Sequence, residues 1–169
     1  PHNINNNSKL NVYTNIDGAV CLKHSSCCGM NNQGYGITVF NHTIEWFKKH
    51  PNFSKVFVIG LGCECAQISL YQDKEENDPV VYMNIQDEGG TKEIINKVSS
   101  QILEILPDLN RDKRVQIPIS ELTVALQCGG SDAYSGITAN PALGYASDLL
   151  VKYGGSTILA ETPEIYGAE

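Results

Sequence analysis

The sequence predicts an α/β fold: a single domain with a mostly parallel sheet and helices on both faces, in a Rossmann-like three-layer arrangement. One observation is that short apolar runs, typical of buried strands, alternate with helical patterns along almost the whole chain. Another is that polar, glycine-bearing connections follow the predicted strands, whereas ordinary surface turns lead into them. This asymmetry is expected of a sheet that binds a ligand at one edge.

The first part of the chain contains two predicted strands and one long predicted helix. Residues 1–9 are polar and asparagine-rich, so we expect a flexible tail before one α/β domain that takes up residues 10–169. The apolar runs at residues 18–22 and 55–61 predict strands, and the second run is continuous enough for burial on both faces of a sheet. Apolar residues at helical spacing predict a helix over residues 38–50, which the following proline ends.

The rest of the chain continues the alternation. The remaining predicted elements are a helical stretch ending near residue 71, strands over residues 79–85, 120–127 and 156–161, and helices over residues 91–106 and 142–153. Apolar residues three and four apart predict the helix over 91–106, with Thr91 as its N-cap. Asn140 and Pro141 are favoured at the N-cap and first position of a helix, and Gly154 is a typical helix end.

Composition narrows the class of protein. Of the 169 residues, 41% are hydrophobic and 18% are charged, as in a soluble globular domain. A net charge of −7 argues against a nucleic-acid partner, and no apolar run reaches the ~20 residues that a membrane span needs. Most of the six cysteines lie beside glycines in predicted loops, so we expect reduced thiols in a cytoplasmic protein.

Long polar loops follow the strands that end near residues 22, 61, 85 and 126. In a parallel sheet these loops lie at the same edge, so we expect their side chains to share one rim. The rim residues are His24, Cys27, Cys28, Cys63, Glu64, Gln86, Asp87, Glu88, Cys128, Ser131, Asp132, Thr138 and Asn140. Imidazole, thiol and carboxylate groups are ligands for a transition metal such as iron or zinc, although spacing does not identify which of them bind.

Two other classes of protein stay open on the residues alone. Gly60 and Gly62 follow a strand and match half of a dinucleotide-binding fingerprint, but the third glycine is missing because Ala66 lies one position beyond it. A non-catalytic Rossmann-type domain that binds a nucleotide or another ligand is therefore an alternative to an enzyme. A structural assembly domain, with its rim residues buried and internally hydrogen-bonded, is a third.

Four sequence blocks carry a resemblance to a known family. They are residues 58–64 (VIGLGCE), 86–91 (QDEGGT), 127–132 (QCGGSD) and 135–141 (SGITANP). With His24, Cys28 and the ending at residues 161–169 (ETPEIYGAE), they resemble the altronate/galactarate dehydratase family, and the ending favours the altronate branch. Family members are much longer, so the resemblance implies a fragment, the central domain, that works with the remaining domains of an enzyme.

The resemblance implies a hydro-lyase that removes water from a sugar acid of the altronate or galactarate type and gives a keto-deoxy acid. It also implies Fe2+, or another divalent transition metal, to stabilise the enediolate formed when the proton beside the carboxylate is removed. The implied residues are His24, Glu64 and Asp132 for catalysis, Cys28, Cys63 and Cys128 for the metal, and Gln86, Ser131, Thr138 and Asn140 for the substrate.

Several assignments within this family stay open. His24 and Glu64 are alternatives for moving protons, and His24 or Asp132 could join the cysteines around the metal. The family also includes a sulfolactate sulfo-lyase, so the leaving group is open. Beyond a small-molecule sugar acid and the remaining domains, a second copy of the chain is an open partner.

Overall fold

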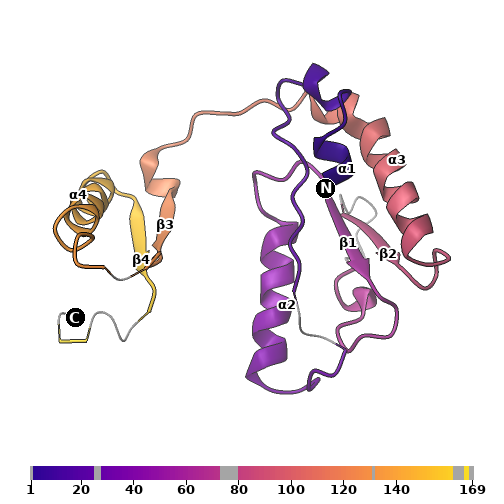
Figure 1. Ribbon diagram of the computed structural model, residues 1–169, viewed down its shortest axis with the longest axis horizontal. Coiled ribbons are helices and arrows are strands. Elements are labelled where there is room, and N and C mark those ends of the chain that lie inside the picture. The colour runs from indigo at the N-terminus through magenta and orange to yellow at the C-terminus, as the bar shows by residue number, and fades with distance from the viewer. Residues whose placement is uncertain (1, 25–27, 73–79, 131, 162–165, 168–169) are drawn as a thin grey trace. The chain divides into compact units, whose positions relative to one another are not determined.

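The computed structural model describes residues 2–24, 28–72, 80–130, 132–161 and 166–167 (Figure 1). The chain forms two compact units, Pro1–Lys113 and Arg114–Glu169. Each unit contains one pair of parallel strands, β1–β2 in the first and β3–β4 in the second. The predicted α/β class with parallel strand pairing is therefore confirmed, while the complete three-layer arrangement stays a prediction.

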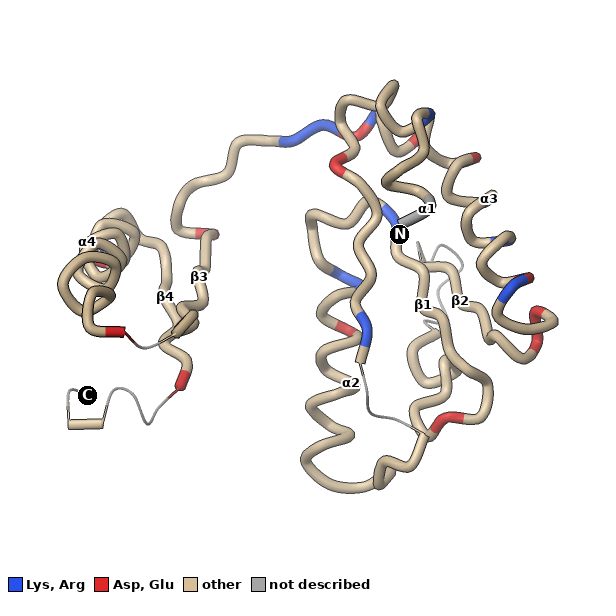
Figure 2. Tube along the Cα trace, in the orientation of Figure 1, with Lys and Arg blue, Asp and Glu red and all other residues tan. Residues whose placement is uncertain are grey.

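The first unit is built around the strands β1 (Val56–Gly60) and β2 (Val80–Asn84), which pair in register from Val56 opposite Val80 to Gly60 opposite Asn84. The longer helices α2 (Tyr35–Lys48) and α3 (Thr91–Leu109) lie on either side of this pair in Figure 1. The short elements of this unit are α1 (His2–Asn5), η1 (Leu10–Val12) and η2 (Ile68–Leu70). Acidic and basic residues are interspersed along it (Figure 2).

An apolar cluster fixes α2 to the segment that follows β1. Ile37 of α2 packs with Ala66 and Tyr71, and these three buried residues are surrounded by half-buried Met30, Phe40, Ile44 and Tyr82. Tyr71 therefore contacts α2 on one side and β2 on the other. This packing anchors the far end of the loop that carries Cys63.

Lys48 adds a buried polar connection to the same cluster. Its ammonium donates hydrogen bonds to the Tyr71 carbonyl and to Glu45 Oε1 at 3.0 Å, and lies 5.6 Å from the centre of the Tyr82 ring. Tyr82 Oη also donates to the Tyr71 carbonyl, at 2.5 Å. Burial by itself lowers the pKa of Lys48, but hydrogen bonds with Tyr82 and Glu45 outweigh it, so this pKa is raised above the ordinary value for lysine.

The N-terminal segment differs from the expectation. Residues 18–22, predicted as a strand, have no regular structure, because the side chain of Asn5 binds the backbone N–H and carbonyl of Ala19 at 2.8 and 3.0 Å. Within residues 1–9, predicted as a tail, Ile4 is buried. Asn15 is tied to Asn110, at the end of α3, by two more hydrogen bonds of 3.0 and 2.9 Å.

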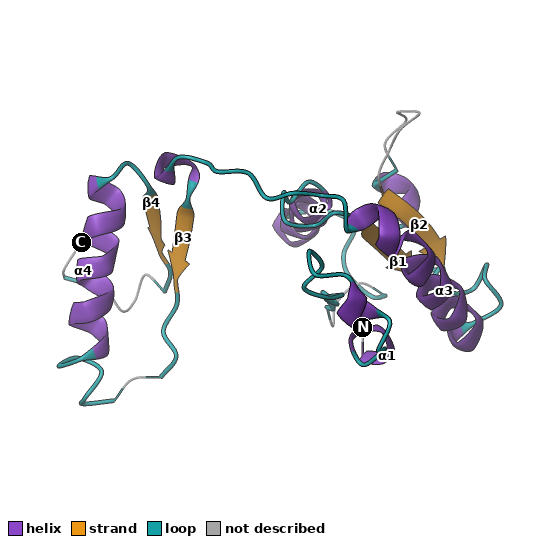
Figure 3. Cartoon of the chain, turned by 90° about the horizontal axis from the view of Figure 1, so that it is seen from above, coloured by secondary structure: helices purple, strands orange, loops and turns teal. Residues whose placement is uncertain are grey.

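The second unit contains a parallel strand–helix–strand arrangement, seen from above in Figure 3. Its elements are η3 (Ile119–Glu121), β3 (Thr123–Leu126), α4 (Ala139–Lys152) and β4 (Ser156–Leu159). Thr123 pairs with Ser156 and Leu126 with Leu159. Gly154 has φ +94° and follows α4, so the predicted glycine at the helix end is confirmed.

The starts of the three longer helices differ from prediction by one to three residues. The helix α2 begins at Tyr35, three residues before the predicted start at residue 38. The N-cap of α3 is Gly90, with φ +106°, and Thr91 is the first helical residue. The N-cap of α4 is Thr138, so Asn140 and Pro141 already lie inside the helix. None of the helices in the described part of the chain is long and apolar enough to cross a bilayer.

Candidate functional site

The loops after β1 and β2 start side by side, because backbone pairing continues past both strand ends. The Ile85 N–H donates to the Gly60 carbonyl at 2.9 Å, and the Gln86 N–H donates to the Leu61 carbonyl at 3.1 Å. The side chains then meet as well: Gln86 Nε2 donates a hydrogen bond to Cys63 Sγ at 3.4 Å. Two site residues predicted from separate sequence blocks are thus brought together at the carboxyl edge of a parallel strand pair.

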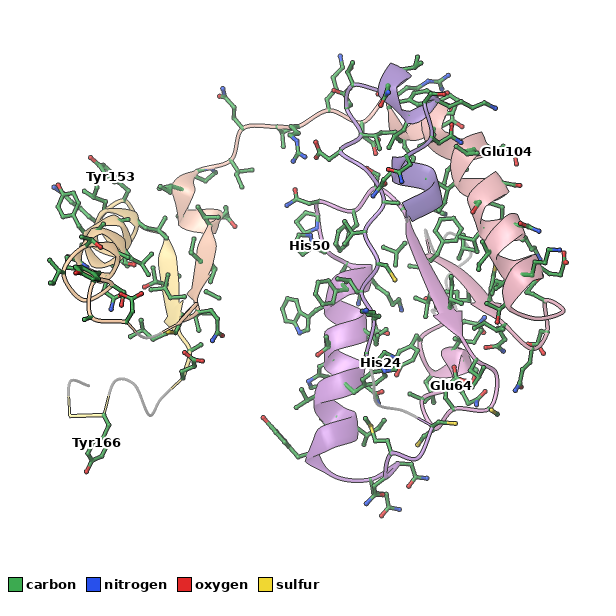
Figure 4. All side chains as sticks on the ribbon, viewed as in Figure 1. His24, His50, Glu64, Glu104, Tyr153 and Tyr166 are labelled. Carbon is green, nitrogen blue, oxygen red and sulfur yellow. The ribbon has the colours of Figure 1, made fainter. Side chains whose placement is uncertain are left out.

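Glu64 lies under this loop instead of on its surface. The residue is only 8% exposed. Its Oε1 accepts a hydrogen bond from the Leu61 N–H at 2.9 Å, and its Oε2 accepts one from the Gly62 N–H at 2.6 Å. Gln67 Nε2 donates to the Glu64 carbonyl at 2.5 Å. Figure 4 shows Glu64 within the turn that follows β1. Its carboxylate is therefore engaged by the backbone of its own loop.

Two glycines make this close packing sterically feasible. A Cβ at Gly60 would lie 2.3 Å from Glu64 Oε1 and 2.7 Å from Asn84 Oδ1, distances that real side chains do not reach. Gly62 has φ +114°, and a Cβ there would lie 2.8 Å from Gln86 Oε1. Glycine is needed at both positions, at Gly60 for space and at Gly62 also for its backbone conformation.

Asn84 is a site residue that lies outside the motifs and the predicted rim. It ends β2, and its Nδ2 donates to Asp87 Oδ2 at 2.8 Å. Its Oδ1 is buried and has no hydrogen-bond partner among the described residues. The sequence feature that indicates Asn84 is a carboxamide at the end of an otherwise apolar strand, two residues before the QDEGGT block begins at Gln86.

His24 and Cys28 are exposed residues of the first unit. The His24 ring contacts Phe40 of α2 edge-to-face, with ring centres 4.6 Å apart and planes at 75° (Figure 4). Cys63 is exposed as well, and Cys65 is half-buried. In the parts of the chain that the structure describes, no three His, Cys, Asp or Glu side chains are grouped closely enough to hold a metal ion.

The predicted site residues of the second unit follow β3. Cys128 is exposed, and Asp132 Oδ1 accepts hydrogen bonds from the Tyr134 and Ser135 N–H groups, both at 2.8 Å. Thr138 Oγ1 donates to the Tyr134 carbonyl at 2.9 Å. Asp132 and Thr138 therefore stabilise the turn that leads into α4. Asn140 is exposed there, and its N–H donates to the Ser135 carbonyl at 2.8 Å.

Two residues named from the sequence, Cys27 and Ser131, lie outside the described residues. Of the others, the structure joins Cys63 directly to Gln86 and places Glu64 beneath the same loop. His24 and Cys28 belong to this unit too, whereas Cys128, Asp132, Thr138 and Asn140 belong to the second. The prediction of one rim shared by Cys63 and Cys128 stays a prediction.

Two family models match the chain, with boundaries close to those of the two units. Residues 2–110 match the second domain of the D-galactarate dehydratase/altronate hydrolase model. Residues 119–169 match the C-terminal model of D-galactarate/altronate dehydratase. The unmatched residues 111–118 include the division between the units after Lys113.

Similar proteins extend over most of the chain. An altronate dehydratase of Bacillus subtilis is 36% identical over 156 residues, which are 91% of this chain and 31% of the relative. A galactarate dehydratase (L-threo-forming) of Escherichia coli is 42% identical over 135 residues, or 75% of this chain and 26% of the relative. A (2R)-sulfolactate sulfo-lyase subunit beta of Chromohalobacter salexigens is 30% identical, covering 98% of this chain and 42% of that subunit. The chain thus spans less than a third of the length of these two dehydratases.

Proposed function

Because the chain belongs to the D-galactarate/altronate dehydratase family, we propose that it forms part of a sugar-acid dehydratase that removes water from altronate or galactarate. Similarity over both units carries this proposal, since the two family models together match residues 2–110 and 119–169. The pairing of the GLGCE and QDEGGT loops supports it, because it places a thiol and a carboxamide at one sheet edge.

Dehydration requires a proton to leave the carbon beside the carboxylate and a hydroxyl to leave the next carbon. The resulting enol tautomerises to a 2-keto-3-deoxy acid. The surroundings of His24 and Glu64 favour His24 for proton transfer, because His24 is an exposed residue whereas both oxygens of Glu64 are bound by backbone N–H groups. We propose Asp132 as a second catalytic residue, and Gln86, Ser131, Thr138 and Asn140 as substrate-binding residues.

The donor chemistry of the candidate ligands fits a divalent transition metal such as Fe2+. Cys28, Cys63 and Cys128 supply exposed sulfur atoms, which are ligands for iron and zinc. We propose that these three residues hold the metal, with His24 or Asp132 as a further donor. When bound, the metal would act as a Lewis acid on the substrate. The remaining domains of a longer polypeptide are proposed to complete the enzyme, and a cytoplasmic location stays a prediction.

Removing the sulfur ligands one at a time tests this proposal. In the longer polypeptide that carries this chain, we expect Cys63→Ala and Cys128→Ala to lower bound iron and to reduce turnover by at least about 100-fold, because losing even a residue that only hydrogen-bonds to a metal ligand costs roughly 10–100-fold. Cys21→Ala is the matched control, because Cys21 is an exposed thiol outside the proposed ligand set. Iron is measured by elemental analysis, and turnover by keto-acid formation from altronate and galactarate.

The substrate panel separates the alternatives. Sulfolactate is included because one relative is a sulfo-lyase subunit, and release of sulfite without dehydration of either sugar acid would support that activity instead. Thermal stabilisation by nucleotides, with no effect of metal and no turnover, would support a ligand-binding domain. Wild-type iron content and turnover in Cys128→Ala would remove Cys128 from the site.

A further inference from the structure

We propose that Glu64 is a positioning residue, which holds the loop after β1 so that the Cys63 thiol meets the side chain of Gln86. The consequence for catalysis rests on the proposed function, but the loop-holding role does not. The sequence alone leaves Glu64 as a candidate for proton transfer. The contacts of its carboxylate instead assign it to the backbone that carries Cys63.

The carboxylate of Glu64 binds its own loop at two consecutive positions. Oε1 accepts from the Leu61 N–H and Oε2 from the Gly62 N–H, at 2.9 and 2.6 Å. Charge-assisted bonds of this kind are stronger than neutral ones. The backbone N–H groups of the two residues before Cys63 are therefore held by the residue directly after it.

The other side of the loop is fixed by β2. The Leu61 carbonyl accepts from the Gln86 N–H at 3.1 Å, so Leu61 is bound at its N–H by Glu64 and at its carbonyl by Gln86. Cys63 is exposed, and its sulfur accepts a hydrogen bond from Gln86 Nε2 at 3.4 Å. Glu64 and Gln86 thus bind the same peptide group, the one between Leu61 and Gly62, and Gln86 also binds the Cys63 thiol.

A proton-transfer role does not fit this environment as well. A general base needs an oxygen within hydrogen-bond reach of the substrate. Glu64 is 8% exposed, and each of its oxygens already has a backbone donor. Gly60, against which its Oε1 packs, leaves no space for an approaching group on that side.

Nuclear magnetic resonance on the chain tests the proposal without any need for activity. We expect the amides of Leu61 and Gly62 to exchange with solvent at least tenfold faster in Glu64→Ala, because both lose their acceptor. We also expect Glu64→Ala to shift the side-chain NH2 signals of Gln86 in the same direction as Cys63→Ala shifts them, because both variants weaken the contact between Gln86 and the thiol. Glu64→Gln, which keeps the shape of the side chain and one acceptor oxygen, should show both effects more weakly.

Glu104→Gln is the matched control, because Glu104 is an exposed carboxylate on α3 of the same unit (Figure 4). It should change neither readout, and slow exchange at Ile94 should confirm that each variant keeps its fold. Unchanged exchange at Leu61 and Gly62 in both Glu64 variants would overturn the proposal, as would an unchanged Gln86 signal.

Turnover gives a second, separate test in the longer polypeptide. If Glu64 acts through the loop that Gln86 also holds, the double variant Glu64→Gln, Gln86→Ala should lose no more kcat than the worse single variant. Losses that multiply would instead indicate that Glu64 has its own chemical role. Absence of turnover in the unaltered polypeptide would overturn the proposed function, while the resonance measurements would still decide the role of Glu64.

Discussion

Gly60 is the residue at which the end of β1, the Glu64 carboxylate and the end of β2 come together. Its Cα faces Glu64 Oε1, Asn84 Oδ1 and the Cγ2 methyl of Ile68. The three groups come from three different segments of the chain, and all of them pack against Gly60. At the residue scale, the geometry of the candidate site therefore depends on the absence of a single methyl group.

Replacing Gly60 by alanine should destabilise the first unit. The new methyl would lie 2.3 to 2.8 Å from three neighbouring atoms, and overpacking of this kind costs about 1–3 kcal/mol. The measurement is the free energy of unfolding in urea. Gly36→Ala is the control, since Gly36 lies in α2 with no atom near its Cβ position, and there we expect no loss of stability. Equal stability of both variants would show that the Gly60 neighbours move freely.

At the scale of elements, α2 is held to β2 through Lys48 and Tyr71. The Lys48 side chain is 2% exposed and carries a charge, which is costly unless the charge is fully hydrogen-bonded. The Tyr71 carbonyl, Glu45 and Tyr82 supply that compensation. Tyr71 also lies at the end of the segment that starts at Cys63. Because Tyr71 packs against α2, the position of this helix is linked to the shape of the candidate site.

The raised pKa of Lys48 predicts a specific dependence of stability on pH. In the unfolded chain a lysine loses its proton near pH ~10.4. Since the folded-state pKa is higher, the stabilisation by Lys48 is complete below that pH and decreases as the pH rises above it. We expect the free energy of unfolding to fall as the pH rises from about 10 to about 11, the range around the pKa of lysine in the unfolded chain. This fall should be steeper in the wild type than in Lys48→Met.

Lys49→Met is the control for this measurement, because Lys49 is the exposed neighbour at the end of α2. Its removal should leave the pH profile of the wild type unchanged. The interpretation would be wrong if Lys48→Met and Lys49→Met gave the same profile.

At the scale of the whole molecule, the chain divides into two units with separate strand pairs. Residues 112–118 between them form no helix or strand and are exposed. The two matching family models leave the same region unmatched. Structure and comparison therefore agree that the two halves are distinct building blocks, although the strand–helix alternation continues through both.

Limited digestion with trypsin should cut this connection early, before the helices of either unit. Lys113 and Arg114 lie in the exposed segment, whereas the lysines of α2 and α3 lie in helices, where proteases act slowly. We expect early fragments that end at residue 111, 113 or 114, identified by mass spectrometry. Arg111→Gln combined with Lys113→Gln and Arg114→Gln should protect the segment. First cleavage at Lys97 in α3 would contradict the division into two compact units.

The parts of the fold that sequence predicts well are those with strong local patterns. The continuous apolar run at residues 55–61 contains β1, and the helical spacing at residues 91–106 contains most of α3. The meeting of Cys63 and Gln86 followed from a general rule, that parallel strands bring their following loops to one edge. No contact had to be known in advance.

Other features depend on side chains whose partners are distant or unexpected. The apolar run at residues 18–22 resembles a strand, but Asn5 takes the backbone groups of Ala19 that a neighbouring strand would need. The start of α4 was placed at Asn140, but the turn stabilised by Asp132 runs into the helix two residues earlier. Likewise, the sequence shows that Glu64 is acidic, not that it faces inward.

The register of the hydrogen bonds between β1 and β2 sets the spacing of the residues at the candidate site. Each residue of a strand advances the chain by ~3.3 Å. A slip of the pairing by one residue would therefore carry Gln86 beyond reach of the Cys63 sulfur and would turn its side chain to the opposite face of the sheet. An insertion of one residue within β2 would displace Gln86 from the Cys63 sulfur in the same way.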